Sequence, residues 1–191
     1  MSLPRGLLWL FAATLVALPC ALAPRPSARA LGLIGPVAEL AAEVQWVRYE
    51  GALTRGEEAH ALALAESALA LAPRVSAGWQ HLAAHLGYDL ASRTVEPDPA
   101  RRRVWLAAAE TTLTRGAAAA ARPAELLLFH ALLLASKADV DPELAPGGKA
   151  ELLARSRALF EQAAELGSHE AREVLGSHRA REVLGYPEAD R

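Results

Sequence analysis

A pattern of small and apolar residues returns every 47 or 48 positions along this chain and limits how the chain can fold. The pattern has offsets of 0, 4 and 7, and it occurs at Ala61, Ala65 and Ala68, at Ala109, Leu113 and Gly116, and at Ser156, Phe160 and Ala163. These offsets keep the three residues on one face of a helix, and small residues there let two helices approach closely. A unit too small to bury its own apolar face must stack on its neighbours, so the repetition predicts an array of stacked helix pairs.

The composition favours helix throughout. Hydrophobic residues make up 52% of the 191 residues but aromatics only 5%, and 44 residues are Ala, a strong helix former. The scarcity of β-branched residues argues against sheets, so the predicted class is all-α. Apolar residues recur at helical spacing, and Gly or Pro residues separate the segments. This pattern predicts helices at about 37–55, 57–72, 76–91, 99–115, 123–137, 148–166 and 168–184. Trp46, Trp79 and Trp105 are expected to anchor the helices in the core.

The best-defined unit resembles the tetratricopeptide repeat (TPR) family. Its matching residues are Gly56, Ala61, Ala68, Leu69, Pro73, Trp79, Leu82 and Ala83, which fall on the family's spacing. Glu50 and His130 depart from that pattern, and the later units are longer than the usual ~34 residues. The resemblance implies a right-handed solenoid of about three helix pairs over residues 31–167, a C-terminal capping helix over 168–191, and a role in binding other proteins without catalysis.

The resemblance also implies a concave groove lined by the first helix of each pair. The residues expected there are Val44, Val47, Gly51, Thr54, Arg55, Gln80, Ala84, Gly87, Tyr88, Glu125, Leu128, Leu132 and Ser136. Most of them are small or apolar, so the groove would suit an amphipathic helix or an apolar peptide. The alternative is that a terminal helix of the same chain fills it.

Two insertions of similar sequence extend the longer units, at Ser92–Arg101 and Lys137–Lys149. Insertions at equivalent positions of stacked repeats project from one edge of a solenoid, which makes the acidic residues Glu96, Asp98, Asp141 and Glu143 candidate edge-loop contacts for a partner. The alternative is that both insertions are helix-capping turns.

A metal site is a further alternative. His81, His85 and Asp89 are spaced four apart and would share one side of a helix, where such side chains can bind a divalent metal. Leu82 follows His81, so the Glu of an H-E-x-x-H motif is missing. No G-x-S-x-G motif occurs and Cys20 is the single cysteine, so we expect no catalytic residue and no cofactor.

Residues 1–30 have the layout of an export signal. Arg5 precedes an apolar run at 6–23, and a Pro- and Arg-containing stretch follows. As a helix the run would be about 27 Å long, slightly short of the roughly 30 Å hydrocarbon core. Three readings stay open: a single-pass anchor in a bacterial cytoplasmic membrane with the body in the periplasm, cleavage after Ala30 to give a secreted or periplasmic protein, and a buried helix of a cytosolic protein. The bacterial source is an interpretation of the Ala- and Arg-rich composition.

The charge of the body excludes a nucleic-acid partner. From Leu31 onward it carries 17 basic and 22 acidic residues, a net charge of about −5, with no basic stripe. The favoured function is a non-enzymatic adaptor or assembly factor that binds another exported or membrane protein. The alternatives are an accessory subunit of a membrane complex held by its N-terminal helix, and a small metal-binding protein that uses His81, His85 and Asp89.

The C-terminus contains a duplicated nonapeptide, Ser168–Gly176 followed by Ser177–Gly185. Nine residues at 100° each amount to 900°, so in one continuous helix the apolar faces of the two copies would point in opposite directions. The first copy is expected to cap the array against the helix of Phe160. The second is expected either to follow a kink at Gly176 or to offer an apolar patch to a partner.

Overall fold

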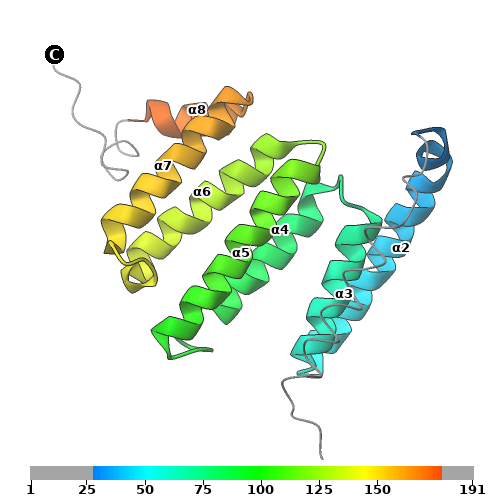
Figure 1. Ribbon diagram of the computed structural model, residues 1–191, viewed down its shortest axis with the longest axis horizontal. Coiled ribbons are helices and arrows are strands. Elements are labelled where there is room, and N and C mark those ends of the chain that lie inside the picture. The colour runs from blue at the N-terminus through cyan, green and yellow to red at the C-terminus, as the bar shows by residue number, and fades with distance from the viewer. Residues whose placement is uncertain (1–27, 178–191) are drawn as a thin grey trace, which may run out of the picture. The chain divides into compact units, whose positions relative to one another are not determined.

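The computed structural model describes the backbone of residues 28–177 and the side chains of residues 35–177. All regular structure in this part of the chain is helical, so the all-α class is confirmed (Figure 1). Contacts divide the chain into two units, residues 1–37 and 38–191, and the packing of the second unit is the subject here.

The helices follow the predicted order closely. They are α2 (Ala28–Thr54), α3 (Glu58–Leu71), α4 (Ser76–Ala84) with the π-helix η1 (His85–Leu90), α5 (Pro99–Ala119), α6 (Pro123–Val140), the 3-10 helix η2 (Pro142–Leu144), α7 (Gly148–Glu165) and α8 (His169–Gly176). The two largest differences from the predicted bounds lie at the first and last helices. Helix α2 begins at Ala28, well before the predicted start, and Pro36 lies inside it. Helix α8 ends at Gly176, since Ser177 is extended at φ −74° and ψ 124°.

Capping and turn residues stand at the helix boundaries, as the sequence predicts. The Asp98 side chain accepts a hydrogen bond from the backbone N–H of Ala100, 2.9 Å away, and so caps α5 ahead of a proline in its first turn. Gly56 and Gly167 adopt φ of 72° and 97°, a left-handed conformation that favours glycine, where α2 and α7 give way to the next helix.

The helices alternate between two layers. Figure 1 shows α2 with α3, α4 with α5, and α6 with α7 as neighbouring pairs. One member of each pair belongs to what we call the even layer (α2, α4 with η1, α6, α8), in which Gln80 Nε2 donates to the Glu125 carbonyl across α4 and α6. The other belongs to the odd layer (α3, α5, α7), in which Arg115 of α5 pairs with Glu66 of α3 at 2.9 Å.

The repeated pattern of small residues forms the core between the layers. All nine of its positions are buried: Ala61, Ala65, Ala68, Ala109, Leu113, Gly116, Ser156, Phe160 and Ala163. At Gly116 a Cβ atom would lie 2.7 Å from the Trp79 ring, so only glycine permits this approach of α5 to α4. Trp79 is buried and donates to the Pro73 carbonyl at 2.9 Å, while Trp46 and Trp105 are only partly buried against the core.

The first copy of the duplicated nonapeptide packs where it was expected. Helix α8 lies against α7, Ala171 is fully buried in the same core as Phe160, and Ser168 caps α8 by accepting from the Ala171 N–H. Helix α8 ends with the first copy, because Ser177, the first residue of the second copy, has an extended backbone. The second copy, apart from Ser177, lies outside the described residues, as do residues 1–27 with Cys20 and the export segment.

Candidate protein-binding surface

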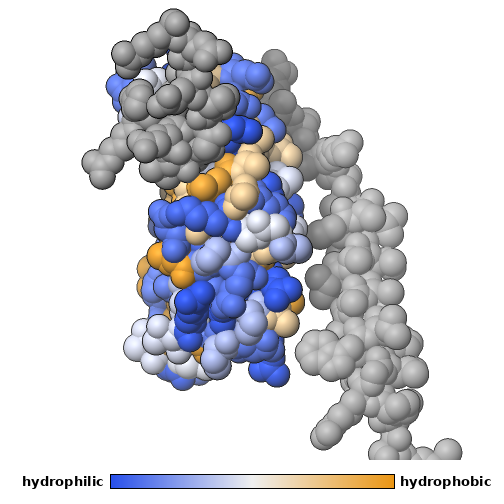
Figure 2. Space-filling view, turned by 90° about the vertical axis from the view of Figure 1, so that its left-hand side faces the viewer, coloured by the Kyte–Doolittle hydropathy of each residue, from blue (hydrophilic) through white to orange (hydrophobic). Residues whose placement is uncertain are grey.

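Exposed apolar side chains gather on the even layer. Those in the bodies of its helices are Leu40, Val44 and Val47 of α2, Tyr88 of η1 and Leu132 of α6. In the described part of the odd layer Val104 of α5 is the one comparable side chain, because the remaining exposed large apolar residues of the second unit lie at helix ends or in loops. On the face of the molecule at α7, where no grey atoms lie, hydrophilic residues predominate, with smaller hydrophobic patches between them (Figure 2). The even layer is therefore the better candidate for protein contact.

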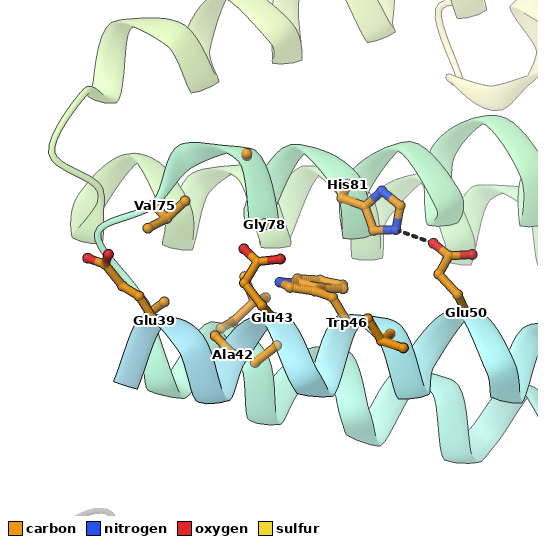
Figure 3. A pocket seen from close by; sticks show the side chains of 13 residues that line it. Glu39, Ala42, Glu43, Trp46, Glu50, Val75, Gly78 and His81 are labelled. Carbon is orange, nitrogen blue, oxygen red and sulfur yellow. Dashed lines mark hydrogen bonds and ion pairs between the residues drawn. The ribbon is translucent and has the colours of Figure 1, made fainter. Parts of the chain in front are cut away.

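A cavity of about 510 Å³ opens between α2 and α4. Trp46 of α2 and Gly78 of α4 line it, with the end of α3 as a third side. Figure 3 shows the carboxylates of Glu39, Glu43 and Glu50 projecting from α2 toward α4, on both sides of the Trp46 ring. The cavity combines an aromatic wall with a negatively charged rim.

A second cavity of about 620 Å³ lies between α6 and α8. Its apolar wall consists of Leu128, Phe129 and Leu132 of α6 with Leu166 at the end of α7. The ring of Tyr88 of η1 meets that of Phe129 of α6 edge to face, with centroids 6.4 Å apart. Both cavities thus lie between neighbouring helices of the even layer.

Most of the predicted groove residues lie on this layer. Val47 lines the first cavity, and Gln80, Leu128 and Leu132 line the second. Tyr88 is partly exposed, Gly51 and Ala84 are half-buried, and Arg55 is exposed in an ion pair with Glu57.

One residue expected in the groove is misplaced. Gly87 is buried, and a Cβ atom there would lie 2.9 Å from the Leu133 side chain. The π-helical geometry of η1 changes the direction in which successive residues point, and a pattern based on 3.6 residues per turn does not anticipate it.

The two histidines and Asp89 do not converge on one point. His81 Nε2 pairs with Glu50 at 2.9 Å, whereas His85 uses Nδ1 for Asp89 at 3.0 Å and Nε2 for Glu58 at 2.8 Å. Among the described residues, no group of three or more His, Cys, Asp or Glu side chains is arranged to hold a metal ion. The histidines instead connect α4 and η1 to α2 and α3.

Tyr49 lies beneath these histidines and was not anticipated as a special residue. It is fully buried, its ring meets those of His81 and His85 edge on, and its hydroxyl has no hydrogen-bond partner in the described part of the chain. Burial raises the pKa of the Tyr49 hydroxyl, and the nearby carboxylates of Glu50 and Glu58 raise it further.

The two insertions meet in a buried ion cluster. Arg102 of α5 is 1% exposed and donates to Asp141 at 2.7 Å, to Glu143, and to the carbonyls of Glu96 and Pro97. Arg93 donates to the other oxygen of Asp141 at 2.9 Å. Of the four predicted edge-loop residues, Asp141 is buried in this cluster and Asp98 caps α5, while Glu143 is half exposed.

The charges in this cluster are stabilised by their partners. Burial acts to raise the pKa of Asp141, but hydrogen bonds and charge from Arg102 and Arg93 outweigh it, so the pKa lies below its ordinary value. Lys137 is also buried and donates to the Ala91 carbonyl at 3.0 Å, and burial lowers its pKa. These side chains join the insertions to each other and leave little of Asp141 for a partner.

No sequence pattern singled out Arg102 or Tyr49. Arginine is usually exposed, and the partner of Arg102 lies 39 positions further along the chain. Tyr49 lies three residues after Trp46, so helical spacing places both on one face of the helix. That spacing does not reveal that the Tyr49 hydroxyl is without a partner in the described structure.

None of the described helices combines the length and apolarity needed to cross a bilayer. No protein-family model matches the chain, and no curated protein or solved structure shows significant similarity to it.

Proposed function

We propose that this chain is a non-enzymatic adaptor or assembly factor that binds another protein on its even layer. The observation that carries this proposal is the distribution of exposed apolar side chains, which gather on α2, η1 and α6 and are nearly missing from the bodies of the described odd-layer helices. Apolar patches on an otherwise polar surface mark sites of protein contact.

The two cavities add support. They lie between successive helices of the same layer and have volumes of about 510 and 620 Å³, enough to receive side chains of a partner. Anchor residues in such pockets commonly provide most of the affinity of an interface.

We further propose that the helix pairs form a right-handed, TPR-like solenoid with the even layer as its concave face. The residue matches from Gly56 to Ala83 and the burial of the repeated small residues support this proposal. The departures at Glu50 and His130 have structural partners, since Glu50 pairs with His81 and His130 with Glu110.

We also propose that the chain is exported and tethered by residues 6–23 to a bacterial cytoplasmic membrane, with the body on the periplasmic side. The order of Arg5, the apolar run and Arg25 supports export. Protease added to intact spheroplasts should then degrade the body.

Site-specific photocrosslinking in the cells of origin tests the binding surface. A benzoylphenylalanine residue replaces Val47 or Leu132 in the full chain, and Val104 of the odd layer provides the matched exposed control. We expect one adduct of defined size from positions 47 and 132 and none from 104. Equal adducts from Val104, or none from the even layer, would overturn the proposal.

A further inference from the structure

We propose that the α2–α4 part of the even layer binds a basic amphipathic helix of the partner protein. The partner's apolar side chains would lie on Leu40, Val44 and Val47, and its lysines or arginines would face Glu39 and Glu43. This inference depends on the proposed function and specifies the chemistry of the partner.

The apolar half of this surface is a ridge on α2 formed by Leu40, Val44 and Val47. Their spacings of four and three residues align them along one side of the helix, and they are 67%, 52% and 73% exposed. The ridge extends for about 10 Å, or two helical turns. A second helix packed along it would place its own apolar residues at the same spacings.

The charged half is an acidic row beside the ridge. Glu39, Glu43 and Glu50 project toward α4, with successive spacings of four and seven residues (Figure 3). Glu50 is paired with His81, whereas Glu39 and Glu43 form no ion pair with any residue that the structure describes. No Lys or Arg lines the cavity between α2 and α4. The row thus offers two exposed carboxylates without local compensation.

The cavity behind the row can receive an anchor. Its volume of about 510 Å³ is within the range that holds small ligands, and the partly buried Trp46 forms one wall. An aromatic or aliphatic side chain of the partner could enter it while a basic neighbour pairs with Glu43. A cationic side chain could also stack on the Trp46 ring.

The signs of the charges decide among possible occupants. An acidic partner or an anionic lipid surface would be repelled by the acidic row, and a neutral apolar segment would leave it uncompensated. Residues 6–29 of the same chain combine an apolar run with Arg25 and Arg29, so they are the competing occupant that an experiment must distinguish.

The test uses the full chain in phosphatidylcholine nanodiscs and two labelled 18-residue helical peptides with the same leucine face. One peptide carries lysine on its polar face and the other glutamate, and empty nanodiscs correct for binding to lipid. Fluorescence anisotropy should show the lysine peptide binding at least ~10-fold more tightly than the glutamate peptide.

The Glu39→Lys/Glu43→Lys variant should weaken binding of the lysine peptide by ~10-fold and strengthen binding of the glutamate peptide. The matched control, Glu165→Lys/Glu173→Lys, makes the same change in net charge at exposed positions of α7 and α8 and should leave both affinities unchanged. Equal effects of the two double variants, or no effect of either, would overturn the inference.

Two further outcomes are informative. If the lysine peptide binds only after Arg25 and Arg29 are replaced by serine, the chain's own segment occupies the surface and the inference is wrong. If positions 47 and 132 crosslink to a natural partner while the charge reversals change nothing, the proposed function stands and this account of its partner fails.

Discussion

Replacement of Asp141 by alanine should strongly destabilise the protein. The two carboxylate oxygens accept from Arg102 at 2.7 and 3.3 Å and from Arg93 at 2.9 and 3.1 Å, and both Asp141 and Arg102 have side chains at most 3% exposed. Removal of one partner from a buried pair leaves an uncompensated charge and costs about 3–5 kcal/mol. Because Arg102 would still donate hydrogen bonds to Glu143 and to two backbone carbonyls, we expect a loss at the lower end of this range, about 3 kcal/mol.

The free energy of unfolding follows from urea titrations monitored by circular dichroism at 222 nm. The matched control is Asp139→Ala, which removes an ion pair with Lys149 of 2.6 Å between two side chains that are more than half exposed. Surface pairs contribute about 0–1 kcal/mol, so this change should cost at most about 0.5 kcal/mol. The double replacement Arg102→Met/Asp141→Leu should recover part of the loss, because it removes both charges of the buried pair.

Equal costs for Asp141→Ala and Asp139→Ala would refute this reasoning. The buried cluster would then not join the two insertions, and Asp141 would return to the set of residues available to a partner. A small loss for Asp141→Ala with an equally small loss for the double replacement would lead to the same conclusion.

Three further predictions concern single groups. Tyr49→Phe should raise the free energy of unfolding by about 1 kcal/mol, because it removes a buried hydroxyl without a partner in the described structure. A lower free energy of unfolding, measured by urea titration, would show that the hydroxyl has a hydrogen-bond partner. Gly116→Ala should lower the free energy of unfolding by about 1–3 kcal/mol, since the new Cβ would lie 2.7 Å from the Trp79 ring. Gly176→Ala, with open space around it, should not lower the free energy of unfolding. Equal melting temperatures for the two variants would contradict the close packing at Gly116. The pKa of Asp141 is lower in the folded than in the unfolded state, so its contribution to the free energy of unfolding is fully present above about pH 4, the ordinary range for Asp, and is lost as the pH falls further. The stability of the Asp141→Ala variant should therefore decline less steeply below pH 4 than that of the parent chain. Parallel declines of the two proteins would argue against a lowered pKa.

The repeated pattern at offsets 0, 4 and 7 and the glycines and prolines between segments were sufficient to predict the helices and their core. The residues at offsets 0, 4 and 7 are buried in every copy, because these offsets place them on the helix face that packs against the other layer. Proline and glycine marked most boundaries because their backbone preferences are local.

The interactions that local patterns missed are long-range or depend on irregular geometry. Arg102 is buried because folding brings Asp141 to it from 39 positions away, and no spacing rule encodes that contact. Gly87 was expected in the groove, but it lies in the π-helix η1 and is buried against Leu133. Most of the other residues predicted for the groove lie on helices of the even layer. The acidic insertions include a buried cluster around Arg102 and Asp141, which composition alone does not distinguish from a polar edge.

The most direct test of the central claim is to measure how much partner co-purifies with the full chain after the even layer is made polar. The Val47→Asp/Leu132→Asp variant changes two exposed residues of that layer, and Val104→Asp is the control on α5. All three positions are exposed, so the melting temperatures should match that of the parent chain. We expect at least a ~10-fold loss of co-purifying partner from the double variant and no loss from Val104→Asp. Undiminished recovery with the double variant would contradict the claim that the even layer binds the partner.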